Sequence, residues 1–227
     1  MIGRARSNHR AEIEDQFFIL SQMAEEIRLH FEKGVDEIEH IAKENAICQA
    51  EGDDLIYSSV MNSYSYDIER RWSMSTQSRQ IIFCAIYAYY EAMLNRIISY
   101  HGISVTIIND LRDAKSMFKR ICTNLLQRSG GRLCLSDDEF TNDYCRLLRN
   151  HFMHGVLIKE ARREELKSLS SKYGGVIYNK DNYAEINEHS FILKVLNSVY
   201  NNVINIDDAF SSLCINQIKR EKEEEER

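Results

Sequence analysis

The sequence contains no proline among its 227 residues, where average usage would supply about ten. Proline stops helices and marks turns, so its absence is typical of a chain dominated by long helices. Glycine is also scarce, at nine residues. These two shortages together predict an all-α fold.

The six cysteines lack the CxxC pairing that is typical of zinc and redox sites. Most of them fall within helical patterns, so we interpret them as buried, reduced thiols of a cytosolic protein rather than a disulfide framework. The same spacing argues against a structural zinc site. The cysteines are Cys48, Cys84, Cys122, Cys134, Cys145 and Cys214.

No long apolar run suggests a targeting or membrane segment. Residues 1–10 are basic and polar with no apolar run behind them, which argues against a signal peptide. The most apolar window, residues 81–100, carries Glu91, Asn95 and Arg96, which argues against a membrane span. We therefore expect a cytoplasmic protein with no membrane partner.

The net charge of −6 would by itself disfavour nucleic acid as a partner. The distribution changes this reading, because residues 111–163 hold eleven Lys/Arg against six Asp/Glu, a local charge of +5. Residues 1–60 hold six against thirteen, or −7. A basic middle beside acidic helices can accept a polyanion locally. The alternative is that these charges only cover solvated helix faces.

The first half of the chain reads as a long helix, a connector and a second helix. Residues 11–48 repeat apolar side chains at alternating steps of three and four, which predicts one long amphipathic helix. Residues 49–75 look irregular and predict a connector whose aromatic side chains lie on the core; base stacking is the alternative use for them. Ser75 or Thr76 can cap the next helix, which should run to Tyr100.

That second helix is apolar nearly all round, a pattern that is typical of a helix in the middle of a bundle. Glu91, Asn95 and Arg96 are conspicuous in such a setting, because buried charges need partners. Glu91 and Asn95 lie four residues apart and share a face. We interpret them as polar groups directed at a site or at a partner arginine, with a purely structural salt bridge as the alternative.

The second half of the chain predicts further helices and one small hairpin. Helices are expected over residues 109–127, from a capping box at residues 136–139, over 158–171 and from Asn187 onward. Residues 176–186 alternate like a short β-hairpin. We predict a single helical domain over residues 1–227. Its parts are the N-terminal helix and connector at 1–75, a helical core at 76–217 and a charged tail at 218–227.

Residues 146–155, Arg-Leu-Leu-Arg-Asn-His-Phe-Met-His-Gly, gather more groups able to bind phosphate and move protons than any other segment. On a helical wheel of about 100° per residue, His151 falls on the buried side. A hydrogen-bonded core histidine is therefore the favoured interpretation of His151. The other residues on that side are Phe140, Tyr144, Leu147 and Leu148.

Arg146, Asn150 and His154 are spaced four apart and should form one polar stripe beside the apolar face. Arg149 points elsewhere, about 140° from His154 on an ideal helix. The two side chains can meet at one phosphate only if the helix end distorts or a second subunit contributes. This geometry favours a composite site.

Residues 149–154 resemble the Arg-x4-His motif of the HEPN superfamily, in its Arg-Asn-x-x-x-His form. HEPN domains are helical bundles, commonly dimeric, and many are metal-independent ribonucleases of toxin–antitoxin and anti-phage systems. The resemblance covers roughly residues 76–215 in helix order. Glu91, on a preceding and mostly apolar helix, matches the acidic residue that many members place near the motif.

The resemblance implies a homodimeric, HEPN-like bundle that cleaves RNA without a cofactor or metal. Arg149, Asn150, His154 and Glu91 would form the catalytic site, and Arg146, Lys119 and Arg120 would help to bind RNA. A histidine that titrates near neutrality suits proton transfer, and the arginine fork suits phosphate charge. The expected products carry a 2′,3′-cyclic phosphate and a 5′-hydroxyl. A cognate antitoxin or defence-system protein is a possible partner.

One position departs from a subgroup of the family. The members that are silenced by nucleotidyltransferase antitoxins carry a modified tyrosine two residues after the motif histidine, where this chain has Val156. Control by AMPylation at that position is therefore excluded. Two alternatives stay open: a catalytically inactive HEPN-like module for dimerisation or sensing, and a metal-dependent enzyme that uses His151 and His154.

Overall fold

The computed structural model describes residues 2–103, 116–131, 133, 135, 138–154, 160–179 and 183–225, without the side chains of residues 2–9, 160, 161 and 215–225. The described chain is all-α, with a long N-terminal helix and a small two-stranded sheet. The prediction of this fold class is confirmed.

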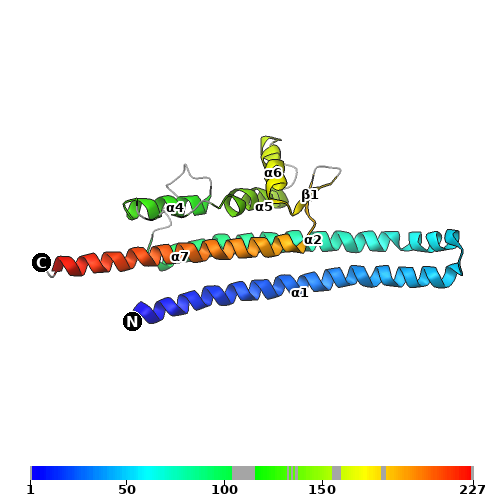
Figure 1. Ribbon diagram of the computed structural model, residues 1–227, viewed down its shortest axis with the longest axis horizontal. Coiled ribbons are helices and arrows are strands. Elements are labelled where there is room, and N and C mark those ends of the chain that lie inside the picture. Colours follow the sequence, from blue (N-terminus) through cyan, green and yellow to red (C-terminus); the bar gives the residue numbers. More distant parts are fainter. Residues whose placement is uncertain are drawn as a thin grey trace. The chain divides into compact units, whose positions relative to one another are not determined.

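The N-terminal helix α1, Ile2–Ala50, and the following helix α2, Asp54–Tyr100, are joined by a tight turn (Figure 1). Glu51 and Gly52 both take positive φ angles, of 46° and 95°, which reverses the chain. Asp53 then caps α2, because its carboxylate accepts hydrogen bonds from the amides of Leu55 at 2.8 Å and Ile56 at 3.2 Å. The two helices begin as an antiparallel hairpin.

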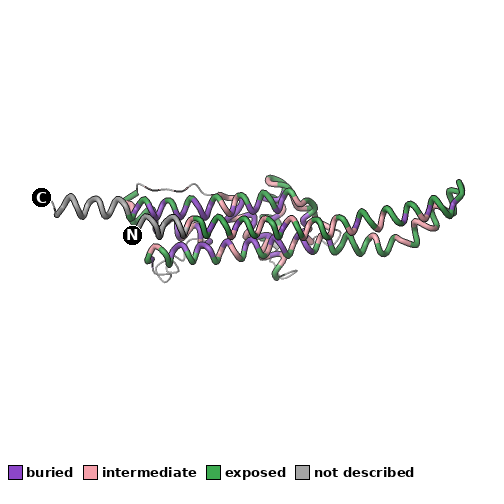
Figure 2. The backbone as a smooth tube through the Cα atoms, turned by 90° about the horizontal axis from the view of Figure 1, so that it is seen from below, coloured by how far each residue is buried: buried purple, intermediate pink, exposed green. Residues whose placement is uncertain are grey.

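This hairpin corrects the prediction of an irregular connector over residues 49–75, since α2 already begins at Asp54. The turn consists only of Glu51, Gly52 and Asp53, and the serines of this region lie within α2. Ser75 does not begin a helix either: it lies inside α2, and its hydroxyl accepts a hydrogen bond from Arg79 at 2.9 Å. No residue between 51 and 74 is buried, as Figure 2 shows.

The predicted end of α2 at Tyr100 is confirmed. Gly102 has a φ of 68°, and the amide of Ile103 bonds the carbonyl of Ile98 at 3.0 Å, which closes the last helical turn. The prediction that Asn95 and Arg96 are buried in the middle of a bundle is wrong, because both are exposed. Alanines at positions 85, 88 and 92 form part of the same exposed face, so an apolar composition does not by itself bury every side.

Shorter elements follow. Helix α4, Met117–Arg128, begins at Ser116, whose hydroxyl accepts from the amide of Lys119 at 3.3 Å. A π-helical segment η1, Phe140–Cys145, leads directly into α5, Arg146–His154, and then comes α6, Glu160–Tyr173. The predicted helix at 109–127 is therefore confirmed from residue 117. Its first residues, part of the capping box and Gly155 lie outside the described residues.

The predicted hairpin is confirmed as strands β1, Val176–Tyr178, and β2, Ala184–Ile186, which pair antiparallel with Val176 opposite Ile186. Asn179 closes the turn, because its side-chain oxygen accepts a hydrogen bond from the amide of Tyr183 at 2.9 Å. The last helix, α7, runs from His189 to Glu225 and includes most of the charged tail.

The described chain clusters into two compact units. Unit 1 comprises Met1–Phe83 and Gly175–Ile192, and unit 2 comprises Cys84–Gly174 and Leu193–Arg227. The division falls inside the helices α2 and α7. The single domain expected over residues 1–227 stays a prediction.

Unit 1 is built by the start of α7 and the β-hairpin packing on α1 and α2. The guanidinium of Arg79 donates to the carbonyl of Ile186 at 2.8 Å, and the rings of Phe83 and Phe191 stack at 6.1 Å. Position 175 has no room for a side chain, because a Cβ there would lie 2.1 Å from the ring of Phe191. The buried core includes Ile13, Phe17, Ile82, Phe83, Ile186 and Phe191.

Unit 2 is built around the second half of α2. Apolar side chains from α2, α4, η1, α5 and α7 bury one another there, including Ile86, Leu94, Ile97, Ile121, Leu125, Tyr144, Leu148, Val199 and Phe210. Hydrogen bonds between polar side chains also join these elements. Tyr90 donates to Asn142 at 3.1 Å, and Asp138 accepts from Ser198 at 2.5 Å and Asn202 at 3.1 Å.

By length and composition α2 could cross a membrane, and half of its most apolar 18-residue window is buried in the structure. A core helix has the same composition. The cytoplasmic location stays a prediction.

A buried histidine–aspartate contact joins the end of α2 to α7 in unit 2. Nε2 of His101 lies 2.9 Å from the Asp207 carboxylate, and the two side chains are 6% and 4% exposed. We expect His101→Leu to lower the free energy of unfolding by about 2–4 kcal/mol, because a buried carboxylate loses this partner. Urea denaturation measures the loss. The double variant with Asp207→Leu should recover stability relative to His101→Leu; a further additive loss would contradict this account of the pair.

Candidate active site

The helix that carries the predicted motif begins irregularly. Each π turn holds one residue more than an α turn, so the η1 segment shifts the phase of the helix that follows. The predicted buried side is nevertheless confirmed, with Phe140, Tyr144 and His151 among its members. The π geometry adds Thr141, Asn142 and Cys145 to the buried set, which an ideal wheel does not predict.

His151 is a core residue, as the wheel predicts. Its side chain is buried, and desolvation together with the charge of Arg163 lowers the pKa of the imidazole from its ordinary value of 6.5. The ring meets that of Phe152 edge to face at 5.9 Å. The neutral form is therefore the stable one inside unit 2.

Because its folded-state pKa is lowered, His151 should make stability fall with falling pH. Below about 6.5 the unfolded chain takes up a proton that the folded chain resists, so the stability present above that pH is progressively lost. Urea midpoints measured between pH 7.5 and 5 test this. The urea midpoint should fall less steeply with falling pH in His151→Leu than in the unchanged protein. An equal fall in both would contradict the lowered pKa of His151.

Arg149 is brought together with two other predicted residues. Nη2 of Arg149 lies 3.8 Å from the Glu91 carboxylate on α2, and its Nη1 donates to the side-chain oxygen of Asn150 at 3.1 Å. Arg149 is 28% exposed and Glu91 44% exposed. Glu91 therefore faces an arginine, as its position predicted. The pair lies at the surface, where an incoming phosphate can reach the guanidinium.

Two of the three predicted RNA-binding residues, Lys119 and Arg146, meet at Asp143. The ammonium of Lys119 on α4 lies 2.8 Å from the Asp143 carboxylate, and Nη2 of Arg146 lies 3.8 Å from the other oxygen. Arg146 also donates from Nε to the carbonyl of Asn142 at 3.1 Å. Arg120 is half-buried on the same helix as Lys119. Asp143 thus holds two cations from two helices, a pairing that the sequence did not reveal.

His154 is the last residue of α5 and is exposed. No described residue hydrogen-bonds to its imidazole, and none of the contacts of Arg149 includes it. The five-residue separation on a regular helix keeps the two side chains about 140° apart. The structure therefore brings Glu91, Arg149 and Asn150 together and leaves His154 apart from them.

Near Arg149, burial raises the pKa of two side chains on α2, the thiol of Cys84 and the phenol of Tyr87. Desolvation raises the pKa of Cys84, although the charge of Arg149 opposes it. Desolvation also raises the pKa of Tyr87 far above its ordinary range. Neither group ionises near neutrality, so Glu91 and His154 are the proton-transfer candidates at this site.

Among the described residues, no group of three or more His, Cys, Asp or Glu side chains could hold a metal ion. His151 and His154 do not form a matched pair, since one is buried and the other exposed. The prediction that the chain uses no cofactor stays a prediction.

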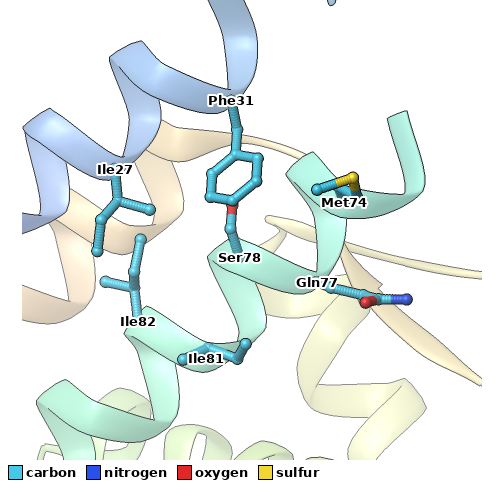
Figure 3. A pocket seen from close by; sticks show the side chains of 7 residues that line it. All are labelled: Ile27, Phe31, Met74, Gln77, Ser78, Ile81 and Ile82. Atoms are coloured by element: carbon cyan, nitrogen blue, oxygen red, sulfur yellow. The ribbon is translucent and has the colours of Figure 1, made fainter. Parts of the chain in front are cut away.

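The structure also holds an apolar hollow in unit 1, shown in Figure 3. It has a volume of about 260 Å³ and lies between α1 and α2. Ile27 and Ile82 face one another across it, and Phe31 points toward Ser78. Because no charged side chain lines it, this hollow offers nothing for acid–base or phosphate chemistry.

Comparison with models of known protein families, with curated proteins and with solved structures finds no match for this chain.

Proposed function

We propose that this protein is a metal-independent endoribonuclease of HEPN type, which cuts RNA to leave a 2′,3′-cyclic phosphate and a 5′-hydroxyl. The observation that carries the proposal is the position of Arg149. It is held at the surface by Glu91 and Asn150, on the same short helix as an exposed histidine. The all-α architecture agrees with the resemblance of residues 149–154 to the family motif.

The chemistry follows from the groups present. The 2′-oxygen of the RNA attacks phosphorus as its proton passes to a base, the P–O5′ bond breaks, and the 5′-oxygen takes up a proton. Arg149 donates two parallel N–H groups to the phosphate oxygens as negative charge accumulates. His154 serves one of the two proton transfers, and Asn150 holds the guanidinium of Arg149 at 3.1 Å.

A homodimer can complete this site, and a dimer-related group or a water molecule serves the second proton transfer. One imidazole cannot take a proton from the 2′-oxygen and give one to the 5′-oxygen in a single concerted step. The separation of about 140° between Arg149 and His154 also means that one copy does not present both to the same phosphate. In the proposed dimer, Arg149 of one copy acts with His154 of the other.

RNA approaches through the basic middle of the chain, where Lys119 and Arg146 already lie together at Asp143. An incoming phosphate competes with the carboxylate for both cations. We assign the activity to a cytoplasmic toxin or anti-phage system, in which a cognate antitoxin or defence protein restrains it.

The direct test is incubation of the purified full chain with total RNA in the presence and absence of EDTA. We expect cleavage that EDTA leaves unchanged. Cleavage abolished by EDTA and restored by a divalent ion would instead support the metal-dependent alternative.

One observation favours a second function. Arg149 is already paired with Glu91 at 3.8 Å, as it would be in a catalytically inactive module for dimerisation or sensing. Such a module would form dimers and leave RNA intact under both conditions. The same incubation, combined with measurement of mass in solution, separates the two functions.

A further inference from the structure

Unit 1 contains a second, polar cavity, far richer in charged groups than the apolar hollow of Figure 3. Its volume is about 390 Å³, which lies within the range of small-molecule sites. Three segments supply its walls: α1, α2 and the residues that lead into α7. The side chains that matter are Glu32, Asp36, Trp72, Arg79, Glu188 and His189.

Arg79 forms a fixed, buried wall of this cavity. Its side chain is 7% exposed, and it donates to the carbonyl of Ile186 at 2.8 Å and to the hydroxyl of Ser75 at 2.9 Å. Glu32 lies 3.9 Å from the same guanidinium and also accepts a hydrogen bond from Arg28 at 2.7 Å. The charge of Glu32 is therefore largely balanced by these two arginines.

His189 lines the cavity with unused hydrogen-bonding capacity. Its side chain is 10% exposed, and neither ring nitrogen hydrogen-bonds to a described residue, although Nε2 lies 3.4 Å from the Glu25 carboxylate. Buried polar groups are normally hydrogen-bonded. Because χ2 of histidine is a soft torsion, the ring can turn a nitrogen toward a bound ligand. Desolvation lowers the pKa of His189, which favours the neutral ring, and a neutral imidazole has one nitrogen that can accept a hydrogen bond.

The remaining charges of the cavity are negative. Three carboxylates (Glu32, Asp36 and Glu188) and the one guanidinium of Arg79 give the lining a net charge of −2. Asp36 and Glu188 are exposed, and no described cation pairs with either of them. A ligand with hydrogen-bond donors and a positive charge would satisfy both carboxylates and the imidazole.

Trp72 adds an apolar, cation-binding surface. Its indole is half exposed, and Nε1 donates to the Glu39 carboxylate at 3.3 Å, which fixes the ring. An indole face attracts ammonium groups and packs against alkyl chains. Carboxylates, an acceptor imidazole and an indole together match an alkylammonium ion better than an anion or a neutral polar molecule.

We propose that this cavity binds a small aliphatic amine, with its ammonium group toward Asp36 and Glu188 and its alkyl chain along Trp72. The site belongs to unit 1 and is independent of the proposed ribonuclease activity, since none of its residues takes part in that chemistry. The amine is either a free molecule or a lysine side chain of another protein, because both present the same group.

Trp72 is the only tryptophan of the chain and lines this cavity, so a ligand bound there should change its fluorescence. The full chain is titrated with 1,4-diaminobutane and with n-butylamine, and with n-butanol as the uncharged control. We expect a saturable change with the amines and none with n-butanol. Asp36→Asn and Glu188→Gln should each weaken amine binding by about threefold to fivefold.

Glu37→Gln is the matched control. It removes the same charge from an exposed residue next to Asp36, but Glu37 does not line the cavity. Its affinity for the amines should equal that of the unchanged protein. An equal response to n-butanol, or unchanged amine binding in the Asp36→Asn/Glu188→Gln double variant, would overturn the proposal. Tighter binding of Nα-acetyl-lysine amide than of n-butylamine assigns the amine to a protein side chain; weaker binding assigns it to a free amine.

Discussion

Replacing His154 by alanine is expected to lower the rate of RNA cleavage by about 10²–10⁴, the usual contribution of a group that transfers a proton. The fold should not change. His154 is exposed at the end of α5 and makes no hydrogen bond to a described residue, so its removal leaves no cavity in the core. Single-turnover cleavage of a labelled RNA measures the rate, and urea denaturation measures stability.

His40→Ala is the control for this experiment, since His40 is also an exposed histidine but lies on α1 in unit 1. It should cleave RNA at the unchanged rate. If His154→Ala is folded and cleaves RNA at the unchanged rate, the imidazole of His154 takes no part in the reaction.

Arg149→Lys should lower the cleavage rate by about 10²–10³, as does the loss of a donor to the transition state at other enzymes. Lysine keeps the positive charge but lacks the planar fork that contacts two phosphate oxygens at once. The exposed pair with Glu91 can form with either side chain, so stability should change little. Rates under saturating RNA separate this loss from weaker binding.

Arg70→Lys, at an exposed position of α2 in unit 1, controls for the general effect of exchanging an arginine. It should leave the rate unchanged. If Arg149 serves only as a structural partner of Glu91, then Arg149→Lys will cleave RNA as fast as the unchanged protein. That outcome would favour the inactive, dimerising module.

Local patterns predicted most of the helices. The absence of proline and the step of three and four in α1 indicated long helices, and Asn187 marked the start of α7 to within two residues. The turn at residues 51–53 was missed because Gly52, Asp53 and Asp54 were interpreted as part of a long connector. A tight turn and a flexible loop use the same residues, and only the tertiary packing of the helices on either side distinguishes them.

The candidate site was predictable only in part. The wheel placed His151 in the core because burial follows the apolar repeat, and Glu91 stood out as a charge in an apolar helix. The cluster of Lys119, Asp143 and Arg146 was not predictable, since it joins α4 to a π-helical turn that no sequence pattern marks. Contacts between distant segments depend on packing, which a periodicity does not encode.

The polar cavity of unit 1 was missed for the same reason. Asp36, Trp72 and Glu188 lie far apart in the chain, and each by itself resembles an ordinary surface residue. Only the antiparallel course of α1 and α2, closed by the start of α7, brings them to one place.

The chemistry of the RNA ends tests the central claim most directly. Total RNA is incubated with the full chain in EDTA, and new ends are captured by a ligation that requires a 2′,3′-cyclic phosphate. We predict abundant cyclic ends with the unchanged protein and a near-complete loss of them with His154→Ala. New 3′-hydroxyl ends, or equal numbers of cyclic ends from the protein and the variant, would contradict the assignment of this site.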